Sequence, residues 1–262
     1  MEIKFADVSC NNLDYKLNFA IKPKQITGVY GSNYLYLIKL LLLNINDYSG
    51  NILVNGKDLK EEDKKKFCYL AKNPYFLTET VSDEFYLIKK DIKISANKYI
   101  DKIVSSLNMV GLSKDYLERK INTLSKSEKK LIQIALGLIS NPELIIFENT
   151  LNSLDGNNTL RIKKLVEELK NDYEKIIIFI DKDINNLYEL SNQVIILDNT
   201  FLVGTNKEIF NNIDYFIDNK LEIPSIIRFI NESKKYNIDL SYSKNIKDLG
   251  KEVVKYVKEN KK

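Results

Sequence analysis

Residues 123–155 read TLSKSEKKLIQIALGLISNPELIIFENTLNSLD, and the fold can be worked out from this stretch. After a Leu-Ser turn, apolar residues recur at helical spacing, and an Asn-Pro break then ends the predicted helix. The apolar run from Leu144 to Phe147 predicts a buried strand, because it is short, continuous and bounded by turn residues. This strand delivers one carboxylate, Glu148, and then an amide, Asn149. An amide cannot take a proton, so a hydrolytic site at this edge would lack its expected acid or base.

Strands and helices alternate after this stretch. The pattern predicts a strand over 143–148, a helix over 156–171, a strand over 175–180, a helix over 183–191 and a strand over 193–198. Such a βαβαβ run indicates a parallel sheet with right-handed crossovers. The carboxyl edge of a parallel sheet is the usual place for a ligand, so Glu148 and Asn149 are site candidates.

The rest of the chain divides by its apolar pattern. The first third is strand-like, with a helix expected over 35–44 and a further strand at KFCYLAK (66–72). Residues 74–140 are helical, and isolated helical segments follow residue 211. The sequence ITGVYGSNYLYLIKLLL, residues 26–42, has the strand, glycine turn and helix of a phosphate-binding loop. It lacks the lysine and the Ser or Thr of a G-x-x-x-x-G-K-[ST] loop, so alone it predicts only a strand–helix turn.

The composition is that of a globular protein with one large domain or a domain plus an appendage: 262 residues, 44% hydrophobic and 29% charged. A net charge of +4 is too small to argue for nucleic acid as a partner. The two cysteines, Cys10 and Cys68, predict no disulfide framework and suit a reducing compartment. The absence of histidine excludes a serine–histidine triad. We expect no secretory signal and no membrane span, since the longest apolar run, 35–45, is too short.

From Leu124 to Asp155 the sequence resembles, without a gap, the segment of the ATP-binding-cassette (ABC) ATPases that runs from their LSGGQ signature to the D-loop. Further matches follow in the family's order. GNILVNGKDL (50–59) is similar to its glycine hairpin, YLAKNPYFLTETVSDEF (69–85) to its Q-loop, and KIIIFIDKDINNLYEL (175–190) to its switch strand. The end of the match, from GTNKEIF (204–210) onward, is similar to the energy-coupling-factor (ECF) importer ATPases.

This resemblance implies an α/β fold, a P-loop NTPase-like ABC cassette with a mixed-sheet core, an antiparallel β subdomain and a helical subdomain. The expected boundaries are 1–211 for the ABC ATPase-like domain, with its helical subdomain at 74–140, and 212–262 for a helical C-terminal extension. The implied partners are a second ABC ATPase subunit, identical or different, and a transmembrane transporter subunit that would hold the chain at the cytoplasmic face of a membrane. Nucleic acid is not an implied partner.

The nucleotide-binding positions depart from the family. These vestigial positions are Gly31, Ser32, Asn33, Tyr34, Leu35, Tyr36 and Lys72. With a short deletion after Asn33, Tyr34 and Leu35 stand where the family has its phosphate-binding lysine and the hydroxyl ligand for Mg²⁺. Lys72 stands at the Q-loop glutamine. The family's cofactors are ATP and Mg²⁺, and these departures imply that their binding is weak or absent.

The catalytic positions are changed as well, so no residue is assigned a catalytic role. Glu148 stands at the metal-binding aspartate, Asn149 at the catalytic glutamate and Lys182 at the switch histidine. Cys10 stands at the adenine-stacking aromatic, for which Tyr15 is the nearest substitute.

The edge that would face a dimer partner is partly kept. Lys126 and Ser127 replace the two signature glycines, whereas Ser125 remains and Asp155 keeps the D-loop acid. The resemblance implies that Lys126 would either clash with a partner's nucleotide or grip it electrostatically.

Losing one positioned general base typically costs about 10²–10⁴ in rate, and base, lysine, hydroxyl and switch residue are absent together. We therefore expect a degenerate subunit of an ECF-like importer, paired with a competent ATPase, whose own site hydrolyses ATP weakly or not at all. Two alternatives stay open: an active ATPase in which Lys72 or Lys182 replaces the missing lysine in space, and a scaffold or regulatory protein that needs no nucleotide. Because a lone buried carboxylate is costly, one hypothesis is that one or both lysines pair with Glu148; the alternative is that both lysines reflect compositional bias and stay unpaired.

Overall fold

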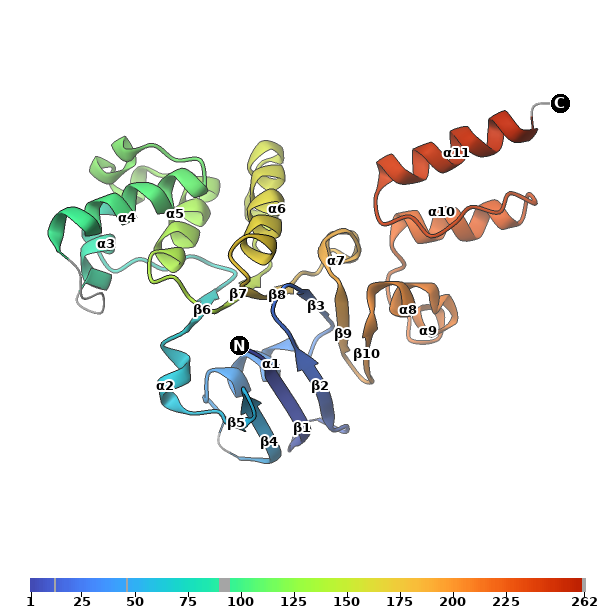
Figure 1. Ribbon diagram of the computed structural model, residues 1–262, viewed down its shortest axis with the longest axis horizontal. Coiled ribbons are helices and arrows are strands. Elements are labelled where there is room, and N and C mark those ends of the chain that lie inside the picture. Colours follow the sequence, from blue (N-terminus) through green and yellow to red (C-terminus); the bar gives the residue numbers. More distant parts are fainter. Residues whose placement is uncertain (12, 46, 90–94, 261–262) are drawn as a thin grey trace.

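The computed structural model describes residues 1–11, 13–45, 47–89 and 95–260, which form two sheets with helices around them (Figure 1). The strands are β1 (Ile3–Cys10), β2 (Leu17–Ile21), β3 (Ile26–Tyr30), β4 (Tyr48–Val54), β5 (Lys57–Asp58), β6 (Phe67–Leu70), β7 (Leu144–Glu148), β8 (Ile176–Ile180), β9 (Gln193–Leu197) and β10 (Phe201–Thr205). The helices are α1 (Tyr34–Leu41), α2 (Glu61–Lys64), α3 (Val81–Ile88), α4 (Ala96–Met109), α5 (Lys126–Leu138), α6 (Gly156–Asn171), α7 (Ile184–Leu190), α8 (Asn206–Asn211), α9 (Ile213–Asp218), α10 (Ser225–Lys234) and α11 (Ile246–Asn260). Short 3-10 turns lie at η2 (Lys114–Glu118), η3 (Ile121–Thr123) and η4 (Leu151–Ser153). The predicted α/β class is confirmed.

The larger sheet has six strands in the order β10-β9-β3-β8-β7-β6. Its neighbours are parallel except for β10, which runs antiparallel to β9. β7 and β8 are buried along their whole length, which explains their continuous apolar residues. The predicted βαβαβ run is confirmed as β7, α6, β8, α7 and β9. Because β3 lies between β8 and β9, the loop after β3 reaches the same carboxyl edge as Glu148.

The smaller sheet is antiparallel, with the order β2-β1-β4-β5. One apolar cluster joins this sheet, α1 and one face of the larger sheet; its members include Phe5, Leu37, Ile146 and Ile178. This packing fixes α1, and with it the loop that precedes α1, over the ends of the parallel strands. The predicted antiparallel β subdomain is therefore present.

Helices α3, α4 and α5 gather on one side of the molecule, at the left of Figure 1. They belong to a second apolar cluster that also includes α6, α7 and the other face of the larger sheet. The hydroxyl of Thr80 caps α3 and that of Ser125 caps α5, so both helices begin at residues whose side chains satisfy a backbone N–H. These helices lie within the predicted helical segment at 74–140, of which residues 90–94 lie outside the described ranges, and the bounds of this subdomain stay a prediction.

The C-terminal helices follow β10. Phe210 of α8 and Phe216 of α9 are buried in the apolar cluster that also contains α3–α7. Helices α10 and α11 project from the end of the molecule opposite to α3–α5 (Figure 1). The division at 211 between a cassette and an extension stays a prediction. Within the described ranges, no helix is long and apolar enough to cross a membrane.

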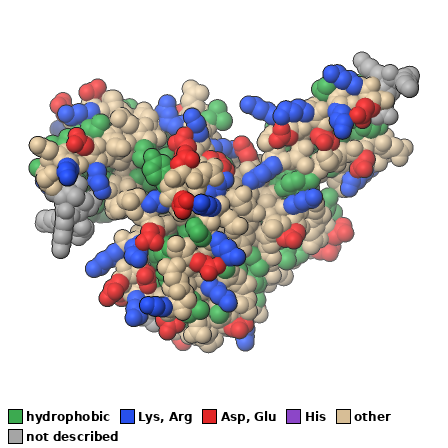
Figure 2. Space-filling model, viewed as in Figure 1, with side chains coloured by type: hydrophobic (Ala, Val, Ile, Leu, Met, Phe, Trp, Pro, Cys, Tyr) green, Lys and Arg blue, Asp and Glu red, His purple; other side chains and the backbone are tan. Residues whose placement is uncertain are grey.

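Charged side chains of both signs are interspersed over the face seen in Figure 2. A nucleic-acid contact needs basic side chains gathered on one surface, and this face carries no broad area of one sign. The expectation that nucleic acid is not a partner stays a prediction.

Candidate functional site

The loop after β3 is held against the end of β9. Gly31 has a left-handed φ of +114°, and a Cβ there would lie 2.1 Å from the carbonyl oxygen of Leu197, so this close approach requires glycine. The N–H of Asn33 donates to the same oxygen at 2.9 Å, and its side-chain amide donates to the carbonyl oxygen of Asp198 at 2.8 Å. The Ser32 hydroxyl donates to Asp198 Oδ1 at 2.6 Å. Donors that a phosphate loop would direct at an anion are therefore used within the protein.

Tyr15, the nearest substitute for the family's adenine-stacking aromatic, also makes contacts within the protein. The Tyr15 hydroxyl donates to the carbonyl oxygen of Asp198 at 3.0 Å, and its ring stacks on Phe201 with centroids 5.7 Å apart. Cys10 is buried. The ring of Tyr15 thus packs on Phe201, and its hydroxyl binds the turn after β9.

Glu148, the last residue of β7, is 5% exposed and accepts three hydrogen bonds. The Tyr34 hydroxyl donates to Oε1 at 2.7 Å, while the Tyr69 hydroxyl and the backbone N–H of Lys72 donate to Oε2 at 2.6 and 2.8 Å. Burial alone would raise the pKa of Glu148, but the bonds from Tyr69, Lys72 and Tyr34 outweigh it, and the pKa lies below its usual value. The carboxylate is therefore held in its charged form mainly by neutral donors, with a smaller contribution from the charge of Lys130.

The two phenols respond in the opposite direction. Burial, together with the bond to Glu148, raises the pKa of Tyr34 to about 12 and raises the pKa of Tyr69 as well. Both phenols therefore keep their protons and remain donors at neutral pH.

The predicted pairing of Glu148 with Lys72 or Lys182 is wrong. Among the described residues, none of the ion pairs involves Glu148. The side chains of Lys72 and Lys182 are exposed, and Lys72 reaches Glu148 only through its backbone N–H. A neutral phenol loses less hydration on burial than an ammonium does, so two tyrosines can satisfy the carboxylate at lower cost. The sequence reasoning missed Tyr69, because its contact depends on β6 lying beside β7.

Asn149 follows Glu148 in a left-handed conformation, with φ of +45°. Its Oδ1 accepts from the N–H of Lys182 at 3.1 Å, but its Nδ2 is buried without a hydrogen-bond partner in the part of the chain that the structure describes. Asn149 lines a cavity of about 480 Å³ together with Lys182 and the loop residues Gly31, Ser32, Tyr34 and Leu35. Tyr36 is not part of this lining. The structure thus brings the predicted loop, base position and switch position together, without a group at Asn149 that could accept a proton.

Asp181, which the sequence reasoning did not single out, lines the same cavity. Burial raises the pKa of this carboxyl. Its two oxygens accept from the N–H of Asp183 at 2.9 Å and from the amide of Asn186 at 3.2 Å. These bonds tie Asp181 to the start of α7, which is a structural role.

These residues do not fit a nucleotide with Mg²⁺ in the way the resemblance implies. Both oxygens of Glu148, which stands at the family's metal-binding position, already accept protein donors. No cluster of three or more Asp, Glu, Cys or His side chains suited to a metal occurs in the described ranges. The loop also supplies no lysine, since Tyr34 at that position donates to Glu148 instead.

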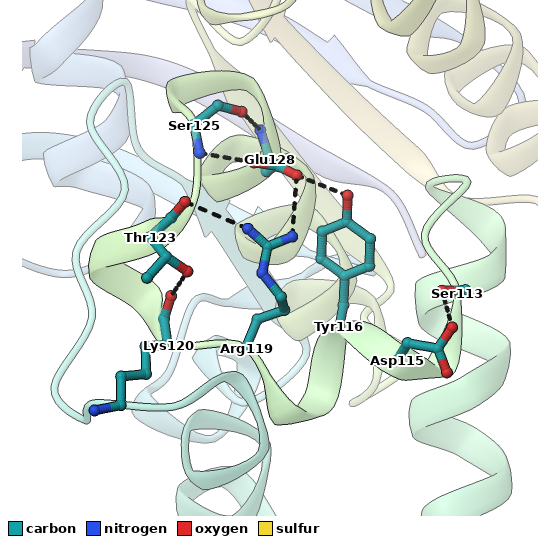
Figure 3. A network of polar contacts seen from close by, with 8 residues as sticks. All are labelled: Ser113, Asp115, Tyr116, Arg119, Lys120, Thr123, Ser125 and Glu128. Atoms are coloured by element: carbon teal, nitrogen blue, oxygen red, sulfur yellow. Dashed lines mark hydrogen bonds and ion pairs between the residues drawn. The ribbon is translucent and has the colours of Figure 1, made fainter.

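A polar network around Glu128 orders the residues at the start of α5, which include the signature positions Ser125, Lys126 and Ser127 (Figure 3). Ser125 caps α5 by accepting from the N–H of Glu128, whose carboxylate accepts from the N–H of Ser125 at 2.7 Å. The Tyr116 hydroxyl donates to the same carboxylate at 2.7 Å, and Arg119 lies 3.7 Å from it. Lys126, the first residue of α5, is exposed next to this network. The loop before α5 is therefore fixed while Lys126 remains at the surface.

Asp155, the D-loop acid, lies beside Ser127 at the start of α5. The Ser127 hydroxyl donates to Asp155 Oδ2 at 3.1 Å, and Asp155 caps α6 by accepting from the N–H of Asn158 at 2.9 Å. Asp155 is exposed, and these bonds lower its pKa, so it stays charged. The structure thus joins Ser125, Lys126, Ser127 and Asp155 into one surface, which we call the signature edge.

A parallel sheet with a glycine turn and helix at its carboxyl edge, an antiparallel β subdomain and a helical subdomain define a P-loop NTPase-like cassette. The family model described as ABC transporter matches residues 15–152, and the chain belongs to this family.

Several known proteins are similar to the chain over most of its length. It is 24% identical over 264 residues to the energy-coupling factor transporter ATP-binding protein EcfA of Malacoplasma penetrans, covering 97% of this chain and 91% of that protein. It is 27% identical over 283 residues to EcfA3 of Oenococcus oeni, covering 97% of each. Among solved structures, cbiO1 from Clostridium perfringens, part of the ABC transporter complex cbiONQ, has a TM-score of 0.72 at 19% identity and covers 87% of this chain and 98% of its own. The likeness to cbiO1 supports the cassette fold.

Proposed function

We propose that this chain is the degenerate ATP-binding-cassette subunit of an ECF-like membrane importer. It would pair with a second, competent cassette subunit and dock on a transmembrane subunit, while its own site would not hydrolyse ATP. The names of EcfA and EcfA3, which cover nearly all of this chain, support the transporter role.

The contacts of Glu148 carry the proposal that hydrolysis is lost. Tyr34, at the position of the phosphate-binding lysine, donates to this carboxylate and so places a neutral ring where a cation would be required. Asn149 cannot act as a base. Losing a preorganised charge stabiliser costs a factor comparable to losing the base, about 10²–10³. The chain lacks both the base and the lysine. Even if the two losses in rate are not fully additive, turnover should be negligible.

One observation favours an active ATPase instead. Lys182 lines the same cavity as Gly31 and Ser32, so its ammonium could meet a phosphate that entered this cavity. Lys72, the other lysine that could replace the missing one in space, does not line the cavity.

Calorimetric titration of the purified chain with ATP and Mg²⁺, followed by a phosphate-release assay, separates the two. We expect no saturable heat at millimolar ATP and no phosphate release above background. Saturable binding with turnover that Lys182→Ala abolishes and Lys72→Ala leaves intact would establish the active ATPase and overturn the proposal. Co-expression with the cassette and membrane proteins encoded by neighbouring genes tests the partnership, since a chain that copurifies with neither is not a transporter subunit.

A further inference from the structure

Lys130 lies in the middle of α5 and is fully buried, with 0% exposure. Its ammonium donates to the carbonyl oxygens of Ala71 (2.7 Å) and Lys72 (2.9 Å) and to Oε1 of Gln133 (2.8 Å). Each of its three donors therefore has an acceptor, which is what makes burial of a lysine tolerable. Within the described ranges Lys130 forms no ion pair. Two of its three hydrogen bonds go to backbone oxygens of another segment.

The segment that Lys130 holds is the one that leads from the sheet to the helical subdomain. Ala71 and Lys72 directly follow β6, and Gln133 also donates to Ala71 at 3.2 Å. The peptide group between Ala71 and Lys72 accepts from Lys130 through the Ala71 oxygen and donates through the Lys72 N–H to Glu148. Hydrogen bonds therefore run without a break from α5, through residues 71–72 and Glu148, to Tyr34 at the start of α1.

At its α5 end, this series of hydrogen bonds lies close to the signature edge. Lys126 and Lys130 are four residues apart on α5, one helical turn, so the first turn of α5 cannot tilt without straining the bonds of Lys130. In the dimer proposed above, this first turn would face the other subunit.

We propose that Lys130 is a positioning residue: it locks α5, and hence the signature edge, to residues 71–72 and Glu148 in an orientation that needs no nucleotide in this chain's own site. The chain would then present a preset signature edge to the competent cassette. This inference rests on the proposed function for its purpose, whereas the lock itself is a property of the isolated chain.

Hydrogen–deuterium exchange on the isolated full chain tests the lock, with Lys130→Met, Lys130→Arg and, as matched control, the neighbouring Lys129→Met. We expect Lys130→Met to speed exchange of the amides of residues 71–73 and of the first two turns of α5 by about tenfold, as loss of local hydrogen bonds does. Lys130→Arg should restore protection, and Lys129→Met should leave it unchanged. Exchange in Lys130→Met within about twofold of the parent chain, or no rescue by arginine, overturns the proposal.

If Lys130→Met does not fold, Gln133→Leu removes one acceptor of the ammonium and one donor to Ala71, and the same acceleration is expected. In the assembled complex, Lys130→Met should lower kcat for ATP turnover by the partner with little change in KM for ATP. Faster exchange in the isolated chain combined with unaltered turnover, even when Ser125 and Lys126 are replaced by alanine, would refute the proposed function and leave the lock standing.

Discussion

Replacing Tyr34 by phenylalanine removes the only donor to Oε1 of Glu148 among the described residues and leaves the ring in place. A hydrogen bond to a charged group contributes about 1.5–3 kcal/mol, and a buried oxygen left without a donor puts the loss at the upper end of that range. Tyr69→Phe should cost less, near the lower end, because Oε2 keeps the N–H of Lys72 at 2.8 Å. Both losses are large against a total stability of about 5–15 kcal/mol.

The pH dependence has a definite sign. The folded pKa of Glu148 lies below its unfolded value, so the stability it contributes is present above the unfolded pKa, which is about 4.3, and is lost as pH falls through the folded pKa. Removing a donor raises the folded pKa and so reduces that contribution. The difference in free energy of unfolding between the parent chain and Tyr34→Phe should therefore be largest at neutral pH and smaller under acidic conditions.

Urea denaturation at neutral pH and at pH about 4 measures both effects. Tyr36→Phe is the matched control, since Tyr36 is a neighbour in α1 whose hydroxyl has no hydrogen bond within the described ranges. A Tyr34→Phe variant that stays within about 0.5 kcal/mol of the parent chain at neutral pH, as ordinary surface changes do, would show that the phenol does not stabilise the carboxylate.

Three further outcomes are expected. Gly31→Ala should destabilise the chain by about 3 kcal/mol or more in urea, because its Cβ would lie 2.1 Å from the Leu197 oxygen at a left-handed φ; a variant of parental stability would contradict this. Asn149→Glu restores a carboxylate at the base position but not the lysine, so phosphate release should stay at background, and measurable turnover would refute our account. Burial lowers the pKa of Lys130 to about 8 against the attraction of Glu148, so the unfolded chain binds more protons above that pH. Stability should therefore rise from pH about 8 toward 10, a rise that Lys130→Met must lack.

Local pattern was sufficient for most of the fold. The helix predicted over 156–171 has these bounds as α6, because Asp155 supplies a cap and the apolar residues recur at helical spacing. The strands predicted over 143–148 and 175–180 appear as β7 and β8, since continuous apolar runs of this length suit a sheet buried on both faces. Both signals depend only on residues close together in the chain.

The sequence by itself determined that β7 ends in a carboxylate followed by an amide, and that the loop before α1 has no lysine for a phosphate. It could not show which groups satisfy Glu148, and the lysines it favoured were the wrong ones. Only the tertiary structure decided this, because the donors Tyr34, Tyr69 and the N–H of Lys72 come from α1, β6 and the loop after β6, segments far from β7 in the chain. Sheet order brings those segments to one edge, and at that edge the cost of burying a charge favours neutral donors at short range over an ammonium.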